Sequence, residues 1–273
     1  MLLDVQGRQA YCYTGGKAFD AALPTAVFIH GAQNDHSVWA LQTRYFAHHG
    51  FGVLAVDLPG HGRSEGEPLA TVEGMADWLL ALLDAAGVQR AFLVGHSMGS
   101  LVALETAGRA PQRVAALCMV GTAYPMKVSG ALLDASLHEE HRAIDMVNIW
   151  SHSGMAQKPS SPGPGFFVMS GSRRLMERIS RRNPAKVFHA DFSACNAYSN
   201  GESAAQAVQA PALLLLGKSD MMTPPKAAMG LGKLLAHCTV TQLDDCGHAL
   251  MAEQPDGVLD ALYGFCKANM AAA

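Results

Sequence analysis

Ser97 stands in the pattern Gly95-His96-Ser97-Met98-Gly99, in which one residue separates the serine from a glycine on each side. The apolar run Ala91 to Val94 leads into this pattern, and a stretch with helical spacing, Ser100 to Ala107, follows it. A serine at a sharp strand-to-helix turn has a strained backbone and an exposed hydroxyl, and small flanking residues let the turn close. Free N–H groups at the start of the helix lie beside that hydroxyl. The setting predicts that Ser97 is a nucleophile.

A second match to the same pattern, Gly62-Arg63-Ser64-Glu65-Gly66, lacks this setting. No apolar strand run leads directly into it and Pro68 follows it, so we interpret its serine, Ser64, as a loop residue. Gly60 begins a further glycine-rich pattern after a strand-like run, as in dinucleotide-binding loops. The third glycine of such a loop is replaced by Glu65. The sequence therefore predicts no Rossmann site and no cofactor.

A serine nucleophile needs a general base, because its hydroxyl is weakly nucleophilic at its free pKa. Among the 12 histidines, His248 ends the segment Asp244-Asp245-Cys246-Gly247-His248, just beyond the last predicted strand. Ligand chemistry in open parallel sheets gathers at the carboxyl ends of the strands. We therefore predict that His248 is the base. His30 and His96 also lie at strand ends, but they adjoin turn residues and are interpreted as supports of those turns.

A carboxylate must orient the base. Asp220 ends the segment Gly217-Lys218-Ser219-Asp220, which follows an apolar run, and Pro224-Pro225 beyond it suits the start of a helix. Asp244 and Asp245 are rival candidates because they lie close to the base in the sequence, although we interpret them as polar residues that follow the end of the last strand. With Asp220 as the acid, the order along the chain is nucleophile, acid, base.

Acyl transfer through a tetrahedral intermediate also needs two hydrogen-bond donors for the negatively charged oxygen. The backbone N–H of Met98, directly after the nucleophile, supplies the first. The second is expected in the loop after the apolar run Ala26 to Ile29, at His30-Gly31-Ala32, where the glycine permits a tight turn. We therefore predict an oxyanion hole formed by the backbone N–H groups of Ala32 and Met98.

Short apolar runs bounded by Gly, Pro or Asp alternate with stretches of helical spacing along most of the chain. Such alternation predicts an α/β fold with a parallel sheet and right-handed crossovers. The strands are expected at 2–5, 10–13, 26–29, 53–56, 91–94, 114–120, 212–216 and 239–243. The last helix is expected over Val258 to Met270, with Asp256 as its N-cap.

The alternation stops between about Thr122 and Gln209. This segment contains helix-like pieces, Leu132 to Trp150 and Arg173 to Arg182, and has no apolar strand run. We interpret it as a helical insertion over one end of the sheet; extra scaffold helix is the alternative. The predicted nucleophile precedes the insertion, whereas the predicted acid and base follow it. The segments on both sides of the insertion must therefore belong to one sheet. The core is therefore expected to comprise 1–121 and 210–273, with 122–209 as the insertion.

Composition limits the classes of protein that need consideration. The chain has 273 residues, of which 49% are hydrophobic and 16% are charged, against about 25% charged residues in typical domains. A formal net charge of −3 argues against a partner such as nucleic acid or an anionic membrane surface. No apolar run is long enough to cross a bilayer, and the first residues do not have the pattern of a signal peptide. His138 and His141 are three residues apart, but no further metal ligands lie at a suitable spacing. We expect a cytoplasmic protein without a metal, whose six cysteines stay reduced.

Five ordered elements of the sequence resemble the α/β-hydrolase fold superfamily. They are His30-Gly31-Ala32, Asp57 to Ser64, Gly95 to Gly99, Gly217 to Asp220, and Gly247-His248. The resemblance covers essentially the whole chain. It implies a mostly parallel eight-stranded sheet with a helical cap after the sixth strand, which corresponds here to 122–209.

The predicted activity is that of a serine hydrolase, with a carboxylesterase of small to medium esters as the first hypothesis. Hydrolysis of carbon–carbon bonds in vinylogous diketones, or a perhydrolase-like activity, uses the same three catalytic groups and is an alternative. A ligand-binding protein on a hydrolase scaffold is another. The expected partner is a small-molecule substrate, and the sequence leaves the oligomeric state open, as a monomer or a homodimer.

Two sets of residues are candidates for the substrate pocket. Arginines of the insertion would favour an acidic substrate, unless they form a solvated helix face. These arginines are Arg173, Arg174, Arg178, Arg181 and Arg182. Trp39, Met126 and Trp150 would favour an apolar acyl group, unless they pack in the core.

Overall fold

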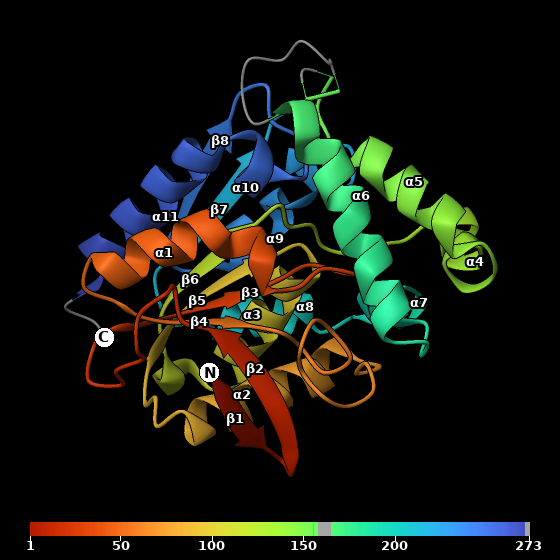
Figure 1. Cartoon of the computed structure of the whole chain (residues 1–273). Helices are drawn as coiled ribbons and strands as arrows, with labels where there is room; N and C mark the ends of the chain where they lie inside the picture. The colour runs from red at the N-terminus through yellow and green to blue at the C-terminus, as the bar shows by residue number, and fades with distance from the viewer. Residues whose placement is uncertain (155, 158–164, 271–273) are drawn as a thin grey trace.

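The chain folds around one sheet of eight strands, in the order β1-β2-β4-β3-β5-β6-β7-β8 (Figure 1). The structure is a computed structural model and describes residues 1–154, 156–157 and 165–270. The strands from β4 to β8 across the sheet run parallel, and the hairpin β1–β2 pairs antiparallel at one edge. Their bounds are β1 (Leu2–Val5), β2 (Arg8–Tyr13), β3 (Thr25–Ile29), β4 (Gly52–Val56), β5 (Ala91–His96), β6 (Val114–Val120), β7 (Ala212–Gly217) and β8 (Cys238–Leu243). The predicted α/β class and the implied eight-stranded, mostly parallel sheet are confirmed.

Helices cover both faces of this sheet, so β3, β4, β5, β6 and β7 are buried along their whole length. One face packs against α1 (Ala40–His48) and α11 (Pro255–Ala268). The other face packs against α2 (Val72–Ala85), α3 (Met98–Arg109), α8 (Gly201–Ala207) and α9 (Met229–Leu234). Short turns of helix complete the connections: η1 (His36–Trp39), η2 (Pro111–Arg113), η3 (Pro225–Ala227) and α10 (Leu250–Glu253). Strand β8 lies at the edge and is only partly covered, as its mixed burial shows.

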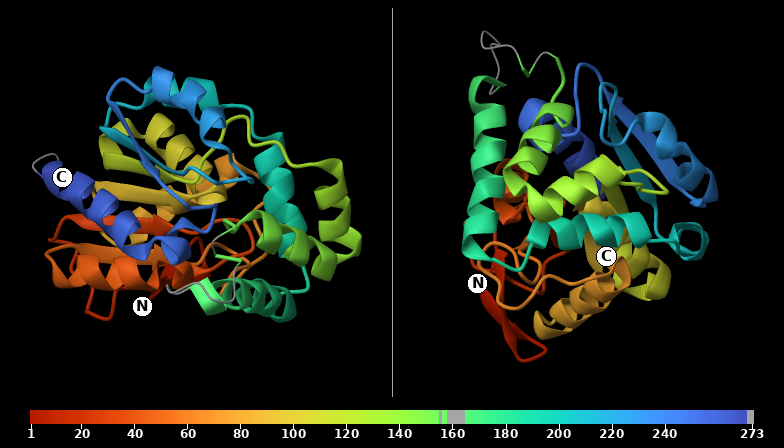
Figure 2. Two further views of the ribbon diagram at one scale, coloured as in Figure 1. Left: turned by 90° about the horizontal axis from the view of Figure 1, so that it is seen from above. Right: turned by 90° about the vertical axis from the view of Figure 1, so that its right-hand side faces the viewer.

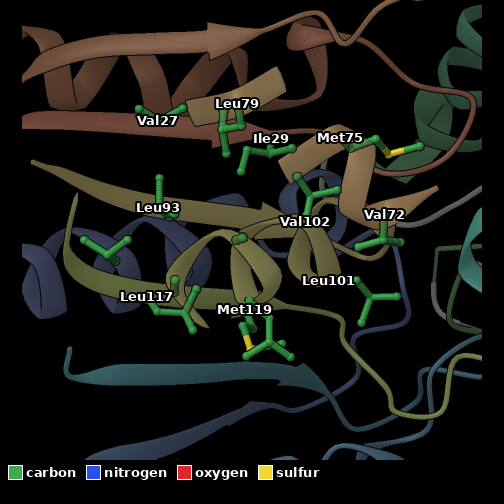
Figure 3. Packing of buried hydrophobic residues seen from close by; sticks show 14 of the residues in the cluster. Val27, Ile29, Val72, Met75, Leu79, Leu93, Leu101, Val102, Leu117 and Met119 are labelled. Carbon is green, nitrogen blue, oxygen red and sulfur yellow. The ribbon is translucent and has the colours of Figure 1, made fainter. Parts of the chain in front are cut away.

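The larger core cluster holds α2 and α3 against the strands (Figure 3). Val72, Met75 and Leu79 recur at helical spacing on α2, and each is at most 1% exposed. Ile29 of β3 and Val102 of α3 belong to the same cluster. Full burial of a side chain of this size contributes about 1.5–3 kcal/mol. This packing fixes α3, whose first residue follows Ser97, relative to β3.

Between the neighbouring strands β6 and β7, the described part of the chain forms helices and no strand. The helices are α4 (Gly130–His138), α5 (Glu140–Trp150), α6 (Gly165–Arg182), α7 (Val187–Ala197) and α8. Helices α4 to α7 gather beside the sheet and share a third hydrophobic cluster (Figures 1 and 2). The pairing of β6 with β7 places both flanks of this insertion in one sheet.

The helix-like piece predicted over Leu132 to Trp150 consists of two helices, because α4 ends at His138 and α5 begins at Glu140. Between them, Glu139 has φ −134° and ψ 54°, outside the helical region. The break lets α4 pack against α7 while α5 packs against α6. The local sequence does not reveal this break, which separates the packing partners of the two helices.

Helix α8 lies within the range predicted as a cap, yet it packs against α3. A Cβ on Gly108 of α3 would lie 2.8 Å from the Cα of Ala204, so the two helices are in close contact. Just before α8, Tyr198 Oη and Asn200 Nδ2 donate hydrogen bonds of 2.7 and 2.9 Å to the buried carboxylate of Glu105 on α3. The end of the insertion is thus part of the helical layer on the sheet.

The prediction of Asp256 as an N-cap is wrong. Helix α11 begins at Pro255, and Gln254 occupies the N-cap position. Proline suits the first helical position because its fixed φ matches the helix and its missing N–H would have no partner there. Asp256 lies in the first turn instead, where a negative charge is favourable at the positive end of the helix dipole.

Within the ranges that the structure describes, no helix combines the length and the apolar character needed to cross a membrane. Helix α6 is 18 residues long, but it contains five arginines: Arg173, Arg174, Arg178, Arg181 and Arg182.

The same substitution in two helices should have opposite effects on the free energy of unfolding. Gly108→Ala places a methyl group against Ala204, so overpacking of about 1–3 kcal/mol outweighs the gain in helix propensity of at most about 1 kcal/mol. Gly264→Ala in α11 meets no atom within 4 Å and should stabilise by about 0.5–1 kcal/mol. Urea titrations of both variants check this. A Gly108→Ala protein as stable as the parent would contradict the close α3–α8 contact.

Candidate active site

Ser97 occupies the turn between β5 and α3, as the sequence predicts. Its backbone angles are φ 51° and ψ −117°, and a non-glycine residue with a positive φ of this kind costs about 1–3 kcal/mol. Its N–H donates a hydrogen bond of 2.9 Å to the carbonyl of Val120, which helps to hold the strained turn against β6. The side chain is half-buried, so its hydroxyl stays accessible from a cavity at the carboxyl ends of the strands.

The flanking glycines are required by backbone contacts. A Cβ on Gly95 would collide with the carbonyl oxygen of Gly99. A Cβ on Gly99 would lie 2.5 Å from the carbonyl oxygens of Ile29 and His30. The turn therefore closes on itself and also presses against the end of β3, which brings the predicted oxyanion loop next to Ser97.

His248 and Asp220 form a hydrogen-bonded pair, with 2.8 Å between Nδ1 and Oδ2. Asp220 Oδ1 accepts hydrogen bonds from the N–H groups of Met222 (2.9 Å) and Thr223 (2.8 Å), and Oδ2 accepts one from the Thr223 hydroxyl (2.8 Å). Burial acts to raise the pKa of the Asp220 carboxyl. The charge of His248 and the hydrogen bonds from His248 and Thr223 outweigh burial, so the pKa of Asp220 lies below its ordinary value. An ionised Asp220 holds the proton of His248 on Nδ1 and leaves Nε2 free to accept one.

Thr223 was missed by sequence reasoning. Its hydroxyl lies 3.0 Å from His248 Nδ1 as well as 2.8 Å from Asp220 Oδ2, so it helps to hold both partners. The signal that could have found it is the spacing Asp220-x-x-Thr223, in which an aspartate accepts backbone hydrogen bonds from the residues just after it.

Ser97 and His248 line the same cavity. A Cβ on Gly121 would lie 3.2 Å from His248 Nδ1, so the end of β6 supports the imidazole closely. Among the hydrogen bonds of the described residues, none joins His248 Nε2 to Ser97 Oγ. Catalytic hydrogen bonds of this type often tighten only when substrate binds.

His30 and His96 have contacts that agree with a supporting role. His96 Nε2 donates to the carbonyl of His248 at 2.9 Å, and burial lowers the pKa of His96 to about 3. His30 Nδ1 donates to the Gly31 carbonyl at 2.8 Å while its Nε2 accepts the N–H of Leu58, and burial lowers its pKa to about 4. Both rings are therefore neutral near pH 7 and brace the loops around Ser97.

The rival residues lie elsewhere. Asp244 and Asp245 are exposed, and Asp244 pairs with Lys218 rather than with His248. Ser64 Oγ donates to the Asp57 carbonyl at 2.5 Å and accepts the N–H of Tyr11 at 2.9 Å. Its position agrees with the interpretation of Ser64 as a loop residue.

The two predicted oxyanion donors belong to segments that adjoin Ser97. A Cβ on Gly31 would be 3.2 Å from Ser97 Cβ, so the loop that carries Ala32 is in close contact with the serine. Ala32 and Ser97 line the same cavities. Met98 is the first residue of α3, and its N–H has no acceptor within the helix. Binding of an oxyanion by these two N–H groups stays a prediction.

Residues 26–261 match the model of a family described as the alpha/beta hydrolase family. The chain belongs to the α/β hydrolase family. The matched range includes Ser97, Asp220 and His248 as well as the whole insertion.

Curated relatives of this α/β hydrolase include several kinds of enzyme. It is 28% identical over 246 residues to a pimeloyl-[acyl-carrier protein] methyl ester esterase of Aromatoleum aromaticum, covering 85% of this chain and 94% of that protein. It is 26% identical over 263 residues to a 2-hydroxy-6-oxononadienedioate/2-hydroxy-6-oxononatrienedioate hydrolase of Paraburkholderia phymatum, covering 90% and 88%. Three relatives with 35–40% identity match over only 98–131 residues, and the chain spans 26–42% of their own length.

Solved structures share the fold of this α/β hydrolase. The enol-lactonase from Burkholderia xenovorans LB400 has a TM-score of 0.82 at 21% identity, covering 98% of this chain and 100% of that one. Similarity at this level of identity shows the common fold.

The cavity beside Ser97 and His248 has a volume of about 730 Å³, and a smaller one of about 200 Å³ adjoins the same two residues. Met126 and Trp150, predicted to bind substrate, line the smaller cavity. The prediction for Trp39 needs correction, because this side chain is 0% exposed. The turn η1 directs the Trp39 ring into the core, 5.4 Å from the ring of Phe28, where no substrate can contact it.

One group in the described ranges has metal-ligand spacing: atoms of Asp35, His36 and Asp57 lie within 4.8 Å of one another. These atoms already have protein partners. His36 Nδ1 lies 2.8 Å from Asp57 Oδ1, and Arg178 donates to Asp35 at 2.7 Å. The cluster therefore carries no metal proposal, and a metal-free enzyme stays a prediction.

Replacement of the predicted acid should separate it from its rivals. Asp220→Asn disturbs the hydrogen-bonded pair and the tautomer of His248, so kcat for p-nitrophenyl acetate should fall by about 10³–10⁴-fold. The control Asp245→Asn changes an exposed carboxylate and should leave kcat within about twofold. Equal losses in both variants, or an active Asp220→Asn enzyme, would contradict the assignment.

Proposed function

We propose that this α/β hydrolase is a carboxylesterase that acts on small to medium esters through an acyl-enzyme. The observation that carries the proposal is the Asp220–His248 pair, whose histidine lines the same cavity as a serine held in a strained turn. A buried carboxylate, an oriented imidazole and an accessible hydroxyl are the three groups that nucleophilic acyl transfer needs.

In the proposed mechanism, Ser97 Oγ attacks the ester carbonyl while His248 Nε2 accepts the hydroxyl proton. Asp220 orients the imidazole and stabilises its charged form. The N–H groups of Ala32 and Met98 donate to the oxygen on which negative charge develops. His248 then gives the proton to the leaving alcohol. A water molecule activated by His248 releases the acid and restores the serine.

The cavity supports a substrate of modest size. Its volume of about 730 Å³ falls within the range of about 300–1,000 Å³ typical of small-molecule sites. Apolar side chains form much of its wall, among them Val38, Leu41, Val147, Leu175 and Met251. Such a lining favours an apolar acyl or alcohol group next to the ester.

Ser97→Ala tests the proposal directly. Loss of the nucleophile should lower kcat for p-nitrophenyl esters by at least about 10⁴-fold, because no covalent intermediate can form. Circular dichroism and the melting temperature should show that the fold is retained. Retained turnover would contradict the nucleophile. A fluorophosphonate probe should label the parent protein but not Ser97→Ala, whereas an unreactive parent protein would favour a binding protein on this scaffold.

A second candidate is hydrolysis of a carbon–carbon bond in an acidic vinylogous diketone, and arginines favour it. Arg174, Arg178 and Arg181 line the cavity from one face of α6, since their spacing of four and three residues places them on one side of a helix. Arg173, by contrast, pairs with Asp145 at 2.7 Å. Arg178 is paired with Asp35, so Arg174 and Arg181 are the candidates to contact an anionic group of a substrate.

A charge-matched pair of substrates tests this second candidate. The double variant Arg174→Gln/Arg181→Gln should lower kcat/KM about 10-fold for a mono-p-nitrophenyl ester of a dicarboxylic acid, because a charged hydrogen bond is lost. The neutral ester of equal length should change by less than twofold. Arg173→Gln is the control and should alter neither. Equal losses on both esters would contradict an anion-binding role, and a carboxylated dienone run beside them measures carbon–carbon cleavage.

A further inference from the structure

Asp191, on α7 of the insertion, bonds directly to the loop that carries Ala32. Its side chain is 0% exposed, and Oδ2 accepts the backbone N–H of Gln33 at 2.8 Å. The same oxygen lies 2.9 Å from Nε2 of His61, in the loop after β4. One carboxylate of the insertion therefore joins two loops at the carboxyl ends of neighbouring strands.

Gln33 needs this support because its backbone is strained. Its φ is 55°, in the left-handed region that non-glycine residues rarely adopt. The side chain is buried as well, and Nε2 donates to the carbonyl of Met176 (3.0 Å) and to Ser180 Oγ (2.7 Å), both on α6. Gln33 directly follows Ala32, so its conformation directs the peptide group between the two residues, which is next along the chain to the peptide group that carries the Ala32 N–H. Contacts from α6 and α7 hold that conformation.

His61 lies between two oxygen atoms, with Nδ1 3.0 Å from the Pro59 carbonyl and Nε2 2.9 Å from the carboxylate of Asp191. Burial acts to lower the pKa of His61, but the charge of Asp191 and the hydrogen bonds outweigh it, and the pKa is raised. A hydrogen bond to an ionised acceptor is about twice as strong as one between neutral groups.

We propose that Asp191 is a positioning residue for the oxyanion hole: by holding Gln33, it sets the direction of the Ala32 N–H. In that case the insertion helps to stabilise the transition state, through Asp191, as well as lining the cavity. This inference rests on the proposed function, in which that N–H binds the oxyanion. Asp191 itself is fully buried and touches no substrate.

The test compares two substitutions of Asp191 with a matched control. Asp191→Ala removes the acceptor and should lower kcat about 10–100-fold with KM within threefold, since the interaction is made only in the transition state. Asp191→Asn keeps the shape with a weaker, neutral acceptor and should lower kcat about threefold to tenfold. If Asp191→Ala does not fold, Asp191→Asn, which has nearly the same shape as the parent residue, still tests the proposal. The control is Asn183→Ala, which loses the bond of its Nδ2 to the Gly60 carbonyl at 3.1 Å but no bond to the oxyanion loop. Its kcat should stay within twofold.

A transition-state analogue separates positioning from a structural role. The inhibition constant of a trifluoromethyl ketone, which forms an oxyanion on the serine, should rise in each Asp191 variant by the factor by which kcat/KM falls. Asp191 variants that lower the melting temperature but leave kcat and this inhibition constant unchanged would overturn the positioning role of Asp191 and leave the proposed function intact. A parent protein that neither hydrolyses esters nor binds the ketone would overturn the proposed function and the inference with it.

Discussion

The site depends on a close backbone contact between the turn at Ser97 and the end of β3. Gly99 lies against the carbonyl oxygens of Ile29 and His30, and Gly31 lies against Ser97 Cβ, with no room for a further side chain. This contact is possible only because β3 and β5 are neighbours in the sheet, with parallel register over the whole of β3. Once it forms, the nucleophile and the loop that carries Ala32 are adjacent. The strands that supply the acid and the base then reach the same edge, because β5, β6, β7 and β8 are parallel neighbours.

The insertion is bonded to both of the loops that flank the serine. On one side, Asp191 of α7 holds Gln33. On the other, the carbonyl of Ser151, at the end of α5, accepts the N–H of Ala249 at 2.9 Å. The carboxylate of Glu253 joins the N–H groups of Ser153 (3.0 Å) and Gly247 (3.1 Å), next to His248. A movement of α5 or α7 would break these hydrogen bonds, so the cavity wall and the reacting groups are coupled.

Three of the buried aspartates of this weakly charged chain have the same kind of partners. Asp57, Asp191 and Asp220 each accept backbone N–H groups and pair with a histidine: His36, His61 and His248 respectively. A buried charge without such partners would be strongly unfavourable. Among the residues that line the two cavities, only His248 belongs to one of these pairs. Access to the serine, and not the presence of an aspartate–histidine pair, therefore distinguishes the site from the two structural pairs.

Short patterns in the amino-acid sequence were enough to predict the strands, the class of sheet and the order of Ser97, Asp220 and His248, because each depends on local residue types and on where a strand ends. The sequence did not reveal the break at Glu139, the burial of Trp39 or the part played by Thr223. The contact between Gln33 and Asp191 spans 158 positions, and no periodicity or motif marks either residue. These features follow from how the insertion and the loops pack against the sheet, so they appear only in the folded structure. Local patterns encode the elements and their ends, whereas contacts between distant loops arise only when those elements are packed together.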